Sequence, residues 1–72
     1  MSMIVFDGAN YEGERVAIEA SKVVAAVSAQ VEEGQIGPRT VILFRSEGTE
    51  QRAVVRHTVE DVAQAINAVM VF

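Results

Sequence analysis

The chain has 72 residues, of which 50% are hydrophobic, with a formal net charge of −4 and no cysteine. This length predicts a single domain over residues 1–72, and the lack of cysteine excludes a disulfide framework and a thiolate metal site. No apolar run approaches the about 20 residues of a membrane-spanning helix, and the start MSMIVFDG lacks the features of a signal peptide. We therefore expect a cytoplasmic protein with no membrane partner.

The first third of the sequence predicts a β-hairpin. Residues 2–6 are a short apolar run, and residues 7–13 form a turn-rich loop with two glycines and an asparagine. Residues 14–19 then alternate, with Val16 and Ile18 on one side of an extended chain. These features favour two strands, at about 2–6 and 14–19, joined by a long loop.

Residues 20–31 fit two patterns. As a helix they present an apolar stripe, and as a strand they present valines and alanines on one face. The density of β-branched valine favours a strand over about residues 22–31, with a helix as the open alternative. Residues 32–39 follow as a polar loop that holds the only proline, Pro38.

A second hairpin is predicted from strands at about 40–46 and 51–57. A two-residue II′ turn at Gly48 and Thr49 would suit glycine, which tolerates positive φ, and it would pair Arg45 with Arg52. Alternation then separates two faces of the hairpin. One face carries Ile42, Phe44, Ala53 and Val55; the other carries Val41, Leu43, Arg45, Arg52, Val54 and Arg56.

The last segment predicts a helix over about residues 59–70. Thr58 is a suitable N-cap, and Asp61 completes a variant capping box in which aspartate replaces glutamate. Apolar residues follow at spacings of three and four, so one stripe of the helix should dock on the face that contains Ile42. The stripe consists of Val59, Val62, Ile66 and Val69.

These elements predict an α+β fold, with a small antiparallel, partly barrelled sheet of about five strands and one C-terminal helix. One helix covers only one face of a sheet, yet both predicted faces carry apolar side chains. A domain of this size buries only about 60% of its unfolded surface, so its stability is marginal without further contacts. We expect a homo-oligomer that uses the second sheet face and the C-terminal residues Val69, Met70, Val71 and Phe72.

The order KVVAAV, RTVILF and then VVRHTVEDV, from Val54 to Val62, carries a resemblance. It is similar to the small FlbD-like family, found near bacterial flagellar genes, and to other short phage and bacterial proteins. Both turns depart from that pattern, since DGANYEG stands in place of a compact Asn-Gly turn and Ser46-Glu47-Gly48 forms the second. The resemblance implies this order of elements and no catalysis.

The sequence contains no motif for catalysis or for holding a cofactor or metal. The five glycines match no nucleotide-binding spacing, and the serines lack a partner motif. His57, the only histidine, is interpreted as a residue that packs beside the helix start, with a ligand or proton-switch role as the alternative. We therefore expect a protein that is not an enzyme.

Residues 39–57 hold four arginines and two glutamates, a local balance of +2 in an acidic chain. Arg45, Arg52 and Arg56 share one predicted face. They are interpreted either as members of local ion pairs or as an anion site for a phosphate or carboxylate between subunits. Duplex nucleic acid is not expected, because it requires a broader basic surface.

Two functional hypotheses follow from the sequence. The first is a small assembly module that binds identical subunits or a larger protein partner through its apolar sheet face. The alternative is a phage-type binder that sequesters an anionic nucleotide or metabolite between subunits through its arginine-bearing hairpin.

Overall fold

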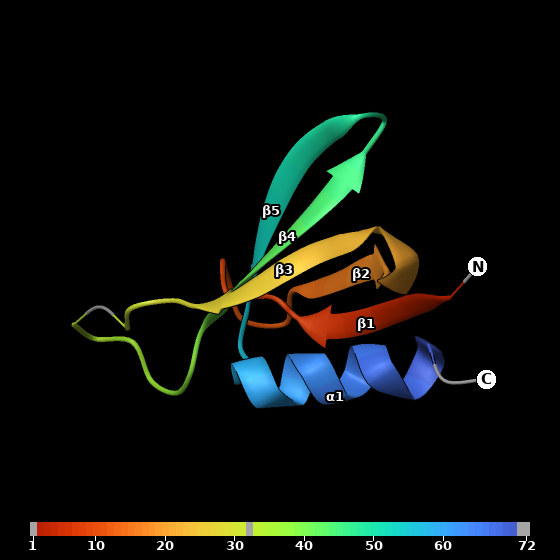
Figure 1. Cartoon of the computed structure of the whole chain (residues 1–72). Helices are drawn as coiled ribbons and strands as arrows, with labels where there is room; N and C mark the ends of the chain where they lie inside the picture. Colours follow the sequence, from red (N-terminus) through yellow and green to blue (C-terminus); the bar gives the residue numbers. More distant parts are fainter. Residues whose placement is uncertain (1, 32, 71–72) are drawn as a thin grey trace.

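The computed structural model describes residues 2–31 and 33–70, with only the backbone described for Met70. The described residues form five strands, a short 3-10 helix (η1) and one α-helix (Figure 1). The predicted α+β class is confirmed. In chain order the elements are β1 (Met3–Asp7), β2 (Arg15–Glu19), η1 (Ala20–Lys22), β3 (Val23–Ser28), β4 (Thr40–Ser46), β5 (Thr49–Val55) and α1 (Val59–Met70).

The strands make two antiparallel sheets, so the prediction of one partly barrelled sheet is wrong. One sheet contains β1 and β2, and the other has the order β3-β4-β5. The turn η1 separates β2 from β3 and carries the chain into the second sheet. Among the described residues, the sheets meet at one bridge between Gly8 and Val55, where the Ala9 amide donates to the Val54 carbonyl over 3.0 Å and the Arg56 amide donates to the Asp7 carbonyl over 2.8 Å. One bridge joins the sheets at a corner and closes no barrel.

The ambiguous segment is a strand, as favoured, but it is shorter than predicted. Its first three residues form η1, and β3 then spans Val23–Ser28. A register shift between Val23 and Ala25 inserts an extra residue opposite β4, and Val24 is left 52% exposed. The hairpin with β4 closes where the Ala29 amide donates to the Arg39 carbonyl over 2.9 Å.

The turn between β4 and β5 differs from the predicted one. Its two central residues are Glu47 and Gly48, with φ of 52° and 78°. Positive φ at both positions is the pattern of a I′ turn, which matches the twist of a hairpin. Arg45 consequently pairs with Glu50 and not with Arg52. The register error is two residues, so every side chain keeps its predicted face.

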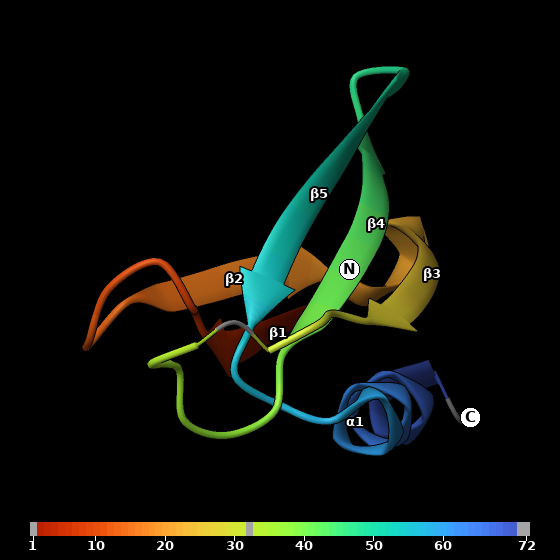
Figure 2. The same cartoon turned by 90° about the vertical axis from the view of Figure 1, so that its left-hand side faces the viewer.

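The core lies on one side of the three-stranded sheet. The helix α1 lies along β3 on that side, and the inner face of the β1–β2 hairpin packs into the same core (Figures 1 and 2). The predicted docking of the helix on this sheet face is therefore confirmed. The buried core residues come from β1, β2, β4, β5 and α1, and they are Phe6, Ile18, Ile42, Val55 and Val62.

The helix begins as its sequence predicts. The Asp61 amide donates to the hydroxyl oxygen of Thr58 over 3.0 Å, and the Val62 amide donates to the Thr58 carbonyl over the same distance. The hydroxyl satisfies one of the donors that the first helical turn leaves without an intrahelical partner, and the Val62 bond is the first of the regular helical series. The cap therefore fixes the end of α1 that adjoins the sheet.

Candidate functional site

The outer sheet face is the side of β3, β4 and β5 turned away from α1 and from the β1–β2 hairpin. Its apolar side chains alternate along the strands with those of the core. Val27 is 53% exposed, whereas Val41 on β4 and Val54 on β5 are half-buried. The apolar members of the outer sheet face are Ala25, Val27, Val41, Leu43 and Val54.

The pairing of the strands joins these side chains into a continuous band. Val41 pairs with Val27 on one side and with Val54 on the other, so three valines cross the sheet in one row. Leu43 is the next outward residue on β4 and pairs with Ala25. Since both covering elements pack on the opposite face, neither of them covers this apolar band.

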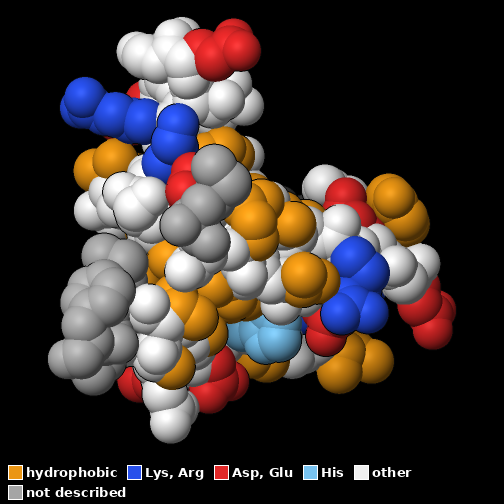
Figure 3. Space-filling view, turned by 90° about the vertical axis from the view of Figure 1, so that its right-hand side faces the viewer, with side chains coloured by type: hydrophobic (Ala, Val, Ile, Leu, Met, Phe, Trp, Pro, Cys, Tyr) orange, Lys and Arg blue, Asp and Glu red, His pale blue; other side chains and the backbone are white. Residues whose placement is uncertain are grey.

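The arginines predicted to hold an anion do not converge on one point. Arg45 pairs with Glu50, and Arg52 pairs with Leu43, so the two arginines are diagonal neighbours on the outer sheet face. Arg56 follows the end of β5, four residues beyond Arg52, which is about 13 Å in an extended chain. Figure 3 shows basic side chains below the acidic tip of the projecting hairpin. The anion site at Arg45, Arg52 and Arg56 stays a prediction.

The predicted C-terminal contact surface is described only in part. Val69 is half-buried on the last turn of α1. Only the backbone of Met70 is described, and Val71 and Phe72 lie outside the described residues.

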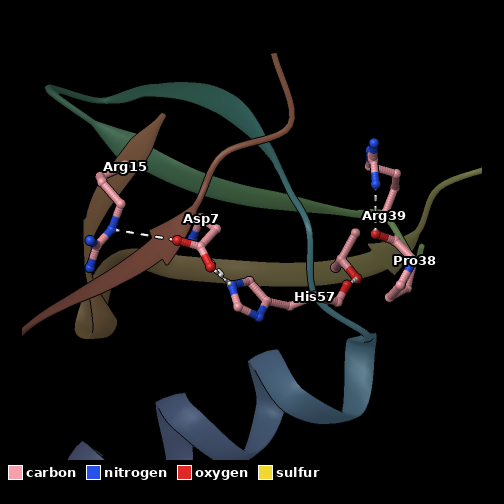
Figure 4. Close-up of polar contacts among 6 residues, drawn as sticks. Asp7, Arg15, Pro38, Arg39 and His57 are labelled. Carbon is pink, nitrogen blue, oxygen red and sulfur yellow. Dashed lines mark hydrogen bonds and ion pairs between the residues drawn. The ribbon is translucent and has the colours of Figure 1, made fainter. Parts of the chain in front are cut away.

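His57 joins three elements at the start of the helix (Figure 4). Its ring packs edge-on against Phe6 with centroids 5.6 Å apart, and its Nε2 accepts a hydrogen bond from the Asp7 amide over 3.1 Å. The hydroxyl of the buried Thr40 donates to the His57 carbonyl over 2.6 Å. These contacts link β1, β4 and the helix start, so the predicted packing role of His57 is confirmed.

Asp7 lies between His57 and Arg15 but does not form a metal site. Its Oδ1 is 3.5 Å from the Arg15 Nε, and its Oδ2 is 3.8 Å from the His57 Nε2. The Arg15 and Asp7 side chains are 66% and 61% exposed, and exposed pairs of this kind contribute little stability. Within the described part of the chain, no cluster of histidine, aspartate and glutamate side chains could hold a metal ion.

Arg39 is a buried cation that the sequence analysis did not single out. It is only 9% exposed, although it lies at the end of a polar loop. It directly precedes β4, and in an extended chain residues 39, 41 and 43 lie on the same face. That alternation is the signal that could have placed it at the base of the outer sheet face.

Comparisons with protein-family models, with curated proteins and with solved structures gave no match. The resemblance to the FlbD-like family therefore rests on the sequence pattern alone. Among the described residues, no helix combines the length and apolar character needed to span a membrane.

Proposed function

We propose that this chain is a non-enzymatic assembly module that associates with further copies of itself through the outer sheet face. The observation that carries this proposal is the band of Val27, Val41, Val54 and Leu43, which crosses an ordered sheet on the side opposite to both covering elements. Removing apolar surface from water stabilises an association by a free energy of about 25 cal/mol per Å² of surface buried. A second copy would supply the layer that this short chain lacks.

The charge of the outer sheet face supports a second copy as the occupant. On β4 and β5 the face carries Arg45 and Arg52 against Glu50, so its balance is only +1 in a chain of net charge −4. Two such faces approach one another with little repulsion. Sheet-on-sheet packing at about 10 Å also brings identical apolar bands together in an isologous contact.

The size of the face sets how much further contact is needed. Three strands of six, seven and seven residues span about 15 Å by about 20–23 Å, whereas a standard interface buries about 800 Å² per partner. The flanks of the outer sheet face would supply the remaining area, because Val69 lies on α1, which packs on the opposite face. A larger protein partner is the alternative occupant within the same function.

Sequestration of an anionic nucleotide or metabolite between subunits is the second hypothesis. It depended on Arg45, Arg52 and Arg56 acting together. The displacement of Arg56 along the chain from the other two gives this arrangement less support than the apolar band.

A matched pair of variants tests the proposed association. Val27→Glu places a charge on the outer sheet face, and Val5→Glu places the same charge on the separate β1–β2 sheet. Val27 is 53% exposed and Val5 is 52% exposed, so the two side chains are equally buried within a single chain. Native mass spectrometry should show loss of the oligomer for Val27→Glu and its retention for Val5→Glu. Retention in both variants would contradict the proposal.

A further inference from the structure

A cavity of about 260 Å³ opens at the base of the outer sheet face. It lies between the β1–β2 loop and the loop that precedes β4. Its polar lining consists of three side-chain amides and one guanidinium, and no described carboxylate lines it. The lining residues are Ala9, Asn10, Ala29, Gln30, Gln35, Arg39 and Val54.

Arg39 brings a positive charge to this cavity, and no described carboxylate lines the cavity beside it. Its Nη1 donates to the carbonyls of Ile36 over 3.1 Å and of Pro38 over 3.2 Å. Its Nε is buried and has no hydrogen-bond partner within the described part of the chain. Among the described residues, no carboxylate forms an ion pair with Arg39. A buried charge is costly unless it is paired, so the guanidinium is suited to receive an anion.

Arg39 lines two cavities, and the residues around it favour binding of the anion in the first of them. Glu60 lines the second cavity as well, and its carboxylate would repel an anion. Among the described residues, Glu14 is a carboxylate that contacts a lining residue of the first cavity, Asn10. Both oxygens of Glu14 already accept hydrogen bonds from Asn10, over 3.0 Å from its amide N and 3.1 Å from its Nδ2.

We propose that the first cavity binds a small oxyanion, a carboxylate or phosphate group, on Arg39. Guanidinium N–H groups form charge-assisted hydrogen bonds with such oxyanions, and the side-chain amide of Gln30 lies in the same lining. The volume is below the about 300–1,000 Å³ of pockets for drug-sized ligands. A short metabolite therefore fits better than a dinucleotide, with Ala9, Ala29 and Val54 as apolar walls.

A titration of the ¹⁵N-labelled full chain tests this site. Inorganic phosphate and succinate are added separately, with sodium chloride at equal ionic strength as the reference. We expect saturable shifts of the Arg39 Nε–H and the Gln30 side-chain amide signals. Arg39→Gln should weaken binding about tenfold or more, since hydrogen bonds to charged groups are strong. Arg52→Gln removes the same charge from the projecting hairpin and should leave the affinity unchanged.

A second variant covers the case in which Arg39→Gln does not fold, because Arg39 also ties its own loop. Gln30 is exposed, so Gln30→Leu keeps those loop contacts and should still weaken binding. A response to only one of the two probes would assign the ligand as a phosphate or as a carboxylate. The proposal is overturned if neither probe gives saturable shifts up to about 10 mM, ten times a Kd of 1 mM. Unchanged binding in a folded Gln30→Leu variant, or equal loss in Arg52→Gln, would also overturn it.

Discussion

The two faces of the three-stranded sheet have similar apolar residues but different surroundings. On the inner face, Ile42 and Val55 are fully buried beneath α1 and the β1–β2 hairpin. On the outer sheet face, Val27 remains 53% exposed although it is as apolar as its inner counterparts. Composition alone therefore does not decide burial; the number of covering elements does. Among the described residues the chain provides one covering layer, formed by α1 and the β1–β2 hairpin, and that layer packs on the inner face.

The largest expected effect is on the inner face. Ile42→Ala should lower the free energy of unfolding by about 3 kcal/mol, because it removes methyl groups from a site with no exposed surface. Urea denaturation measured by circular dichroism checks the loss. Val41→Ala is the matched control on the outer sheet face and should lower the monomer's stability by less than about 1 kcal/mol. Equal losses would show that the two faces are equally buried.

The second-largest expected effect is on the stability of α1, the helix that covers the inner face. Thr58→Ala removes the hydroxyl that accepts a hydrogen bond from the Asp61 amide. This change should lower the free energy of unfolding by about 1 kcal/mol. Thr58→Ser keeps the acceptor and should retain most of the stability. Thermal denaturation of both variants measures the difference in stability. An alanine variant as stable as the wild type would show that the cap does not stabilise the helix α1.

The smallest expected effect is at the hairpin tip, beyond both faces. Glu47 has a φ of 52°, a region that most side chains avoid, while asparagine before glycine suits a I′ turn. Glu47→Asn should therefore raise the free energy of unfolding by about 0.5 kcal/mol and leave the oligomeric state unchanged. A lower melting temperature for Glu47→Asn would mean that the glutamate side chain makes a contact that stabilises the turn.

Much of the fold was predictable because alternation and capping are local signals. The five strands, the helix start at Thr58 and both faces of the β4–β5 hairpin follow from periods of two and 3.6. The division into two sheets was not predictable, because residues Ala20–Lys22 carry no distinct signature of a 3-10 turn. The register failed because Glu47 occupies a conformation that the sequence would assign to glycine.

The candidate sites show the same limit. The outer sheet face was predicted from its apolar residues, whereas the Arg39 cavity was missed because two loops far apart in the sequence build it. No periodic pattern connects Asn10, Gln30 and Arg39. Burial of an arginine at the end of a polar loop depends on tertiary packing, which a local pattern does not encode.

The most direct test of the central claim is the mass of the wild-type chain in solution across a range of protein concentrations. Sedimentation equilibrium in the analytical ultracentrifuge measures it without labels or variants. We predict a mass that rises with concentration to at least twice that of one chain, since the outer sheet face is covered only by association. A mass that stays at one chain over the whole range would contradict the account and would mean that this sheet is stable with one face in water.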